Sequence, residues 1–147
     1  MTADEFLSQI EKYDTLIDGK LNERQKLWCL ATKVTASFDR EAVQSSGVSD
    51  KVGDIGAKLV DVEREIDEIV DFYIDIQREC IEVIERLANK PLMYKVIHKH
   101  YVEYMSYAEI AEEEHYSYTW IMEIRDRALR EVEKILEEKS LKNQKSV

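Results

Sequence analysis

Apolar side chains recur at a regular heptad spacing through the middle of the chain. Alternate steps of three and four residues separate Leu59, Val62, Ile66, Ile69, Tyr73, Ile76, Cys80, Val83 and Leu87. This spacing is typical of a helix whose apolar stripe packs along a second helix. At ~1.5 Å per residue, the helix predicted for residues 57–87 is ~45–50 Å long. A helix of this length cannot bury its stripe alone, so the pattern requires a partner helix.

A less regular pattern predicts a helix over residues 3–42. Its apolar positions fall in two registers, one with Leu7, Leu21, Trp28 and Thr35 and the other with Ile10, Ile17, Ala31 and Phe38. Asp14 and Arg24 interrupt these registers, and the helix can bend or break at Gly19.

Residues 44–56 contain three of the four glycines, which predicts a loop between the two helices. A short loop between two striped helices favours an antiparallel helical hairpin as the basic unit. Pairing of the 59–87 stripe with the same stripe of a second chain, as a homodimer, stays open at this point.

The last third of the chain predicts a helix-turn-helix. Asn89 and Pro91 end the long helix, and a helix from Leu92 to Val102 follows. Residues 106–111 form a short helix with small and apolar positions, and Ser117 suits the N-cap of the next helix. Helical spacing then relates Ile121, Ile124, Ala128 and Leu129. A short helix, a tight turn and a longer helix is the geometry that places one exposed helix in the DNA major groove.

These patterns together predict an all-α protein with three parts. Residues 1–90 form an acidic helical hairpin or coiled-coil arm, residues 91–138 the helix-turn-helix domain, and residues 139–147 a flexible tail. Only 4 Gly and 1 Pro, with 35% charged residues, agree with long solvated helices. The chain has no apolar run of membrane-spanning length and no signal-peptide layout at its start, so we expect a cytoplasmic protein without membrane contact.

Charge is distributed unevenly along the chain. The net charge is −10, and residues 1–90, with 12 basic and 20 acidic side chains, account for most of it. Residues 91–147 hold 9 basic and 11 acidic side chains, so this part is close to neutral. DNA-binding domains usually present a basic face. The near-neutral charge of residues 91–147 is therefore compatible with DNA binding but is not evidence for it.

Residues Tyr94 to Leu136 resemble region four of bacterial sigma factors. The matching motif is Tyr107-Ala108-Glu109-Ile110-Ala111, then Tyr116-Ser117, then Arg125-x-Arg127-Ala128-Leu129. A second resemblance covers nearly the whole chain, through Asp50-Lys51-Val52-Gly53, the segment from Ala57 to Ile66, and Tyr116-Ser117-Tyr118-x-Trp120. These segments look like a family of small phage and prophage proteins of Gram-positive bacteria, carried as a domain of unknown function and similar to the ArpU/RinA-type regulators of phage late genes.

The resemblances imply a DNA-binding transcription regulator acting in the bacterial host cytoplasm, with no enzyme activity and no cofactor. Ser117 would cap the recognition helix, and the base-facing residues would be Tyr118, Thr119, Trp120 and Glu123. Arg125, Arg127 and Arg130 would contact phosphates of a promoter or operator. Sigma region four commonly has Arg or Lys where Tyr118, Trp120 and Met122 stand here, although Glu can still accept from cytosine N4 and Thr can contact the thymine methyl.

Other interpretations of the same residues stay open. Tyr118 and Trp120 suit either groove contact or packing, and the arginines suit either phosphates or ion pairs within their helix. The acids at 112–114 are interpreted as a solvated helix end.

The sequence predicts no metal site. His98 and His100 are two residues apart, so they do not share a helix face. Neither Cys29 nor Cys80 has a CxxC partner, so we expect both cysteines to be reduced thiols that bind no metal. The alternative function is an acidic interaction module that binds RNA polymerase or a host regulator without reading DNA.

Overall fold

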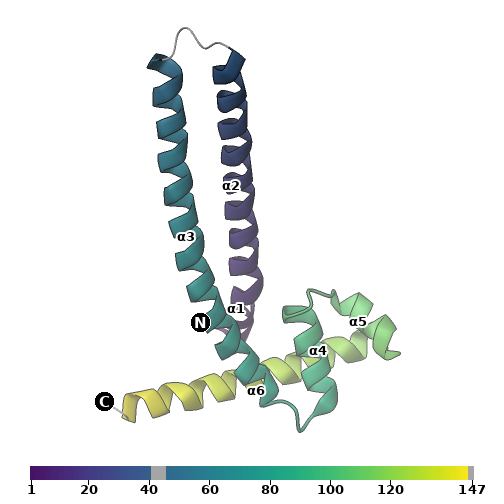
Figure 1. The fold of residues 1–147 in the computed structure, drawn as a ribbon. Helices are drawn as coiled ribbons and strands as arrows, with labels where there is room; N and C mark the ends of the chain where they lie inside the picture. Colours follow the sequence, from purple (N-terminus) through teal and green to yellow (C-terminus); the bar gives the residue numbers. More distant parts are fainter. Residues whose placement is uncertain (41–45, 146–147) are drawn as a thin grey trace. The chain divides into compact units, whose positions relative to one another are not determined.

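The computed structural model describes residues 1–40 and 46–145, with side chains for residues 1–33 and 50–145. Its helices are α1 (Ala3–Leu7), α2 (Gln9–Arg40), α3 (Ser46–Glu85), α4 (Pro91–Tyr101), α5 (Tyr107–Glu114) and α6 (Tyr118–Lys145), shown in Figure 1. The described residues contain helices and no strand, which confirms the all-α class. Contacts divide the chain into one unit of Met1–Lys12 with Ile74–Val147 and a second unit of Tyr13–Tyr73, whereas the sequence placed a boundary at residue 90.

The first helix begins at a capping box. The Thr2 hydroxyl accepts a hydrogen bond from the Glu5 N–H, and the Glu5 carboxylate accepts one from the Thr2 N–H. These two bonds satisfy N–H groups that the first turn leaves open. The helix predicted over residues 3–42 is interrupted at Ser8, between α1 and α2, and runs without a break through Gly19.

The loop predicted over residues 44–56 is wrong for residues 46–56, because α3 already begins at Ser46. Val52 and Ile55 continue the heptad spacing of Leu59, so the apolar pattern of the long helix extends back through Gly53 and Gly56. A glycine costs a helix about 1 kcal/mol relative to alanine, and α3, with 40 residues, tolerates the three glycines that it contains. Ala42, Gln44, Ser45 and the side chains of Thr35 and Phe38 lie outside the described part of the chain.

Within the second unit, α2 and α3 run antiparallel. The rings of Tyr13 and Phe72 pack edge to face at 5.1 Å, and the Lys20 ammonium lies 2.5 Å from the Glu65 carboxylate. Seven residues forward along α2 therefore correspond to seven residues back along α3. Trp28, placed on a heptad stripe by the sequence, is 52% exposed, and Leu27 is the more buried of the two.

Most of the 59–87 stripe is buried inside the chain. The buried members are Val62, Ile66, Ile76, Cys80, Val83 and Leu87. Cys80 donates a hydrogen bond from its thiol to the Phe6 carbonyl at 3.4 Å. Tyr101 is also buried, and its phenol donates to the Asp4 carboxylate at 2.5 Å, which ties α1 to α4. Leu59, Ile69 and Tyr73 are half-buried, so the 59–87 stripe packs mainly within one chain.

The two cysteines should differ sharply in reactivity. Burial raises the pKa of the Cys80 thiol to about 12, whereas Cys29 is exposed on α2. Because the thiolate is the reactive form, we expect one thiol per chain to react rapidly with a disulfide reagent at pH 8 and the second only on unfolding. A thiol titration with and without denaturant measures this, and a Cys29→Ser variant should lose the rapid phase. Two equally rapid phases in the folded protein would contradict the buried position of Cys80.

Pro91 occupies the first turn of α4, as predicted, because its fixed φ suits a helix start and its missing N–H is not needed there. The flexible tail predicted from Lys139 differs from the structure, in which α6 continues to Lys145. Within the described residues, no helix combines the length and apolar composition that crossing a membrane requires.

Candidate nucleic-acid interface

A small apolar core holds α4, α5 and the first half of α6 together. Its buried members are Val96, Ile110, Ala111, Ile121 and Ile124. Half-buried side chains pack around it, namely Leu92, Met93, Met105, Tyr107 and Trp120. Ile110 and Ile121 have no exposed surface, so the angle at which α6 leaves α5 is set by close packing rather than by the turn alone.

Side-chain caps begin both helices of the candidate interface. The Ser106 hydroxyl accepts from the Glu109 N–H, and the Ser117 hydroxyl accepts from the Trp120 N–H, both at 3.1 Å. The N-cap role expected of Ser117 is therefore confirmed. Between the helices, His115 adopts the left-handed conformation (φ 60°, ψ 41°), which lets its N–H and that of Tyr116 bond to carbonyls at the end of α5. This turn connects α5 to α6 through only three residues, 115–117.

Four of the candidate residues form one exposed stripe on α6. We call Thr119, Glu123, Arg127 and Arg130 the α6 face; they lie at spacings of four, four and three residues and are all exposed. Ile121, Ile124 and Ala128, on the opposite side of the helix, are buried. The α6 face therefore points away from the core and offers one acid, two guanidinium groups and one small hydroxyl to a partner.

The two candidate aromatics differ in exposure. Tyr118 is 54% exposed at the start of α6, so its ring and phenol are available to a partner. Trp120 is half-buried and packs against the core, and the Arg127 guanidinium lies 5.4 Å from the centre of its ring. Packing is therefore the observed role of Trp120, while Tyr118 remains a surface residue.

The three arginines have different surroundings. Arg125 donates to the Asp126 carboxylate at 2.7 and 3.0 Å and lies 5.3 Å from the centre of the Tyr107 ring, so it is held against α5. The hydrogen bonds to Asp126 raise the pKa of Arg125 further. Arg127 is 4.0 Å from Glu123, a loose exposed pair, and Arg130 has no ion-pair partner among the described residues. Arg127 and Arg130 are consequently the more available cations.

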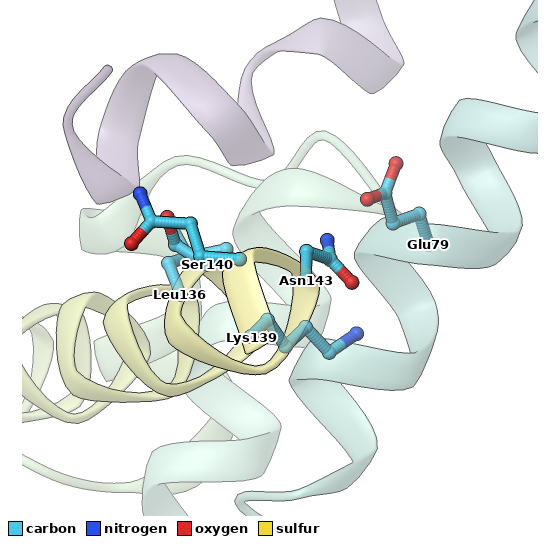
Figure 2. A pocket seen from close by; sticks show the side chains of 6 residues that line it. Glu79, Leu136, Lys139, Ser140 and Asn143 are labelled. Carbon is cyan, nitrogen blue, oxygen red and sulfur yellow. The ribbon is translucent and has the colours of Figure 1, made fainter. Parts of the chain in front are cut away.

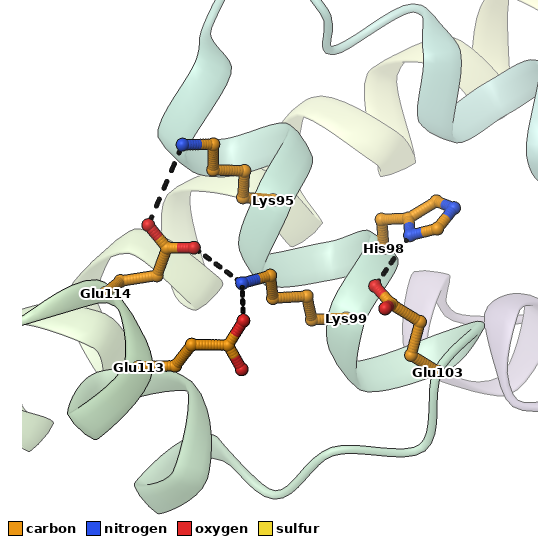
Figure 3. A network of polar contacts seen from close by, with 6 residues as sticks. All are labelled: Lys95, His98, Lys99, Glu103, Glu113 and Glu114. Carbon is orange, nitrogen blue, oxygen red and sulfur yellow. Dashed lines mark hydrogen bonds and ion pairs between the residues drawn. The ribbon is translucent and has the colours of Figure 1, made fainter.

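The acids at the end of α5 form a network with α4, which the sequence analysis read as a solvated helix end. Lys99 lies 2.6 Å from both Glu113 and Glu114, and Lys95 lies 3.7 Å from Glu114 (Figure 3). Acidic side chains at a helix C-terminus repel the negative end of its dipole. The two lysines offset that repulsion and reduce the negative charge near the turn.

This network should make stability depend on pH. The hydrogen bond from Lys99 lowers the pKa of Glu114 below its ordinary value of 4.5. A carboxyl whose pKa is lowered by folding stabilises the protein above its unfolded pKa and loses that contribution as pH falls through the lowered value. We expect Glu114→Gln to lower the free energy of unfolding by about 1 kcal/mol at pH 7, with the difference shrinking as the pH falls below 4.5. Thermal unfolding across this range measures it.

Glu112→Gln is the matched control for this experiment. Glu112 is exposed and has no ion-pair partner among the described residues. The Glu112→Gln variant should show no comparable decrease in the free energy of unfolding at pH 7. Equal effects of the two substitutions would mean that general charge, rather than the contact with Lys99, sets the stability of α5.

The histidines of α4 hold the connection to α5. His98 Nδ1 lies 3.0 Å from the Glu103 carboxylate, and His100 Nδ1 lies 2.7 Å from the Met105 carbonyl. The His100 ring also stacks on Tyr107, with ring centres 3.9 Å apart. Within the described chain, no group of three or more His, Cys, Asp or Glu side chains is arranged to hold a metal ion.

A separate surface hollow lies beside the second half of α6. Its volume is about 540 Å³, and Figure 2 shows Glu79, Leu136, Lys139, Ser140 and Asn143 around it. Its lining residues are polar or charged apart from one leucine. They include no histidine that could act as a base for the Ser140 hydroxyl and no cysteine that could act as a nucleophile. The hollow therefore adds no catalytic arrangement to the interface.

One basic residue was missed by the sequence analysis. Lys134 follows Arg130 by four residues, so it extends the α6 face. It is exposed, and its ammonium lies 3.7 Å from the Glu131 carboxylate. The helical spacing already contained this signal. The Lys99 network had no such signal, because its partners are 14 and 15 residues apart on different helices.

Comparisons with known proteins do not assign the chain to a family. No protein-family model, no curated protein and no solved structure matches it. The geometry of the α6 face, the capped turn before it and the core beneath it are therefore the observations on which a function can be argued.

Proposed function

We propose that this chain is a DNA-binding transcription regulator of the phage type, acting in the cytoplasm of a bacterial host. In this proposal α5, the turn at 115–117 and α6 are a helix-turn-helix similar to sigma region four. The antiparallel α2 and α3 form a helical arm that contacts RNA polymerase or sets the oligomeric state.

The observation that carries the proposal is the α6 face. It lies at the start of a long helix that Ser117 caps and a buried core fixes, next to a short helix that approaches through a three-residue turn. Recognition helices present base-contacting residues from their first turns, with phosphate-contacting cations around them. Tyr118, Thr119 and Glu123 suit the first role, and Arg127 and Arg130 suit the second.

The chemistry of the face predicts a particular style of recognition. Glu123 can accept from a cytosine amino group and the Thr119 methyl can contact a thymine methyl. With two available arginines, the phosphate contribution is small, so binding depends on base contacts more than is usual. Tyr118→Ala or Glu123→Ala should therefore change sequence preference, whereas loss of an arginine should weaken all sequences alike.

The test is binding of the purified full chain to labelled fragments of its own genome. Binding is measured at two salt concentrations with unrelated competitor DNA present. We expect one fragment to be retained selectively and to be released as salt rises, because phosphate contacts release counterions. Equal retention of all fragments, or no retention at low salt, would count against the proposal.

A second candidate function rests on the charge around the face. Glu123 lies near Arg127, Arg125 is held by Asp126, and Glu109 and Glu112 are exposed on neighbouring α5. Such a surface also suits a protein partner with basic groups, such as RNA polymerase or a host regulator. Retention of polymerase by the immobilised chain without any selective DNA fragment would favour this alternative.

A further inference from the structure

The helical pair formed by α2 and α3 within residues 13–73 buries little apolar surface. Among its described side chains, only Val62 and Ile66 are buried. Several large apolar side chains are instead exposed, namely Leu16, Trp28, Leu30, Val52, Val60 and Phe72. Long helices owe most of their stability to packing of an apolar face, and a layer of two helices with two buried side chains supplies little of it.

One side of this pair has the regular spacing of a packing surface. Leu16, Glu23 and Leu30 follow one another at seven-residue intervals on α2, and Lys58, Glu65 and Phe72 do so on α3. Lys20 contacts both Glu23 and Glu65, at 3.3 and 2.5 Å, so the two series flank the same side of the pair. We call these six residues the lateral face.

The lateral face is self-complementary in composition. It places Leu16 and Phe72 near one end, a polar layer of Lys20 with Glu23 and Glu65 in the middle, and Leu30 with Lys58 toward the other end. Both signs of charge are present together with apolar groups, which fits neither the uniformly negative surface of DNA nor a purely basic protein. A polar layer within an apolar seam is also a known device for setting register.

Charge also selects how two copies would meet. Over the described side chains, α2 of this unit holds four basic and three acidic residues, whereas α3 holds three basic and eight acidic residues. Placing α3 against α3 would bring two acidic helices together. Placing α2 of one copy against α3 of the other avoids this and makes every neighbouring pair antiparallel, as in a four-helix bundle.

We propose that the lateral face is an interface between two copies of this chain, which pair as an antiparallel four-helix bundle with α2 of each copy against α3 of the other. Leu16 of one copy then packs on Phe72 of its partner, and the polar layers around Lys20 meet at the centre. The surface differs from the buried 59–87 stripe, and the proposal does not depend on DNA binding.

Sedimentation equilibrium of the full chain tests this proposal. We expect twice the mass of one chain at micromolar concentration, with no weakening in raised salt because apolar contacts dominate and each copy is acidic overall. The double variant Leu16→Glu/Leu30→Glu should weaken association at least about a hundredfold, since it removes two apolar side chains from the interface and adds two negative charges to a face that already holds Glu23 and Glu65. Circular dichroism should show unchanged helix, because both side chains are exposed in one copy.

The matched control is Val60→Glu/Leu141→Glu. These two side chains are 64% and 58% exposed and lie outside the lateral face. The control should sediment as the wild type does, and the single variants Leu16→Glu and Leu30→Glu should each show part of the effect. A wild-type chain that is a monomer at all concentrations, or a control that dissociates as readily as the lateral-face variant, would overturn the proposal.

Discussion

Replacing Arg127 and Arg130 together by alanine is expected to weaken binding to the selected DNA fragment by about 10- to 100-fold at low salt. Both side chains are exposed on the α6 face, and Arg130 has no ion-pair partner among the described residues. Each phosphate contact releases counterions from DNA when it forms. The slope of log affinity against log salt should therefore fall by about two for the double variant. Fluorescence anisotropy at several salt concentrations measures both quantities.

The control removes the same charge from another part of the chain. Lys51 and Arg78 are exposed on α3, and the double variant Lys51→Ala/Arg78→Ala has the same net charge as the test variant. Its salt slope should stay at the wild-type value. If both double variants lose affinity equally, long-range charge explains the binding and the α6 face is not the contact surface.

Ile110→Ala is expected to lower the free energy of unfolding by about 2–5 kcal/mol, the range for truncating a buried aliphatic side chain. Ile110 has no exposed surface and belongs to the core that joins α4, α5 and α6. Truncation leaves a cavity at the point where α5 meets α6. Urea unfolding followed by circular dichroism measures the loss.

The same variant links stability to the proposed function. Because the core fixes the direction of α6, the Ile110→Ala variant should also bind the selected DNA fragment more weakly at temperatures where it remains folded. Val60→Ala, at a side chain that is 64% exposed, should change the free energy of unfolding by less than about 0.5 kcal/mol. A loss at Ile110 no larger than the loss at Val60 would show that this core does not hold the three helices together.

The sequence predicted the structure correctly where the interactions that form it join residues close together in the chain. The spacing from Leu59 to Leu87 determined a long helix, Pro91 determined the start of α4, and Ser117 determined the cap of α6. Each of these features depends on residues within a few helical turns of one another, so the residue types and their spacing are enough to predict it. The exposed positions of Thr119, Glu123, Arg127 and Arg130 follow from the same periodicity.

The sequence misled where a local preference competed with a longer pattern. Gly53 and Gly56 indicated a loop, yet they lie in α3 because the apolar spacing runs through them. The polar residues after Lys139 indicated a frayed end, yet α6 continues to Lys145. A low helix propensity costs about 1 kcal/mol or less per residue, and this cost is too small to end a long helix that is already formed.

Only the tertiary structure decided which side chains are available at the candidate site. Arg125 and Arg127 are two residues apart, and each guanidinium lies beside an aromatic ring, but the Arg125 side chain is 29% exposed and the Arg127 side chain 54% exposed. Trp120 packs on the core and Tyr118 faces solvent. Likewise, Lys99 neutralises Glu113 and Glu114 across two helices. These outcomes depend on contacts between helices, so the helical sequence determined the elements and the faces, while packing between elements decided which residues remain free to bind.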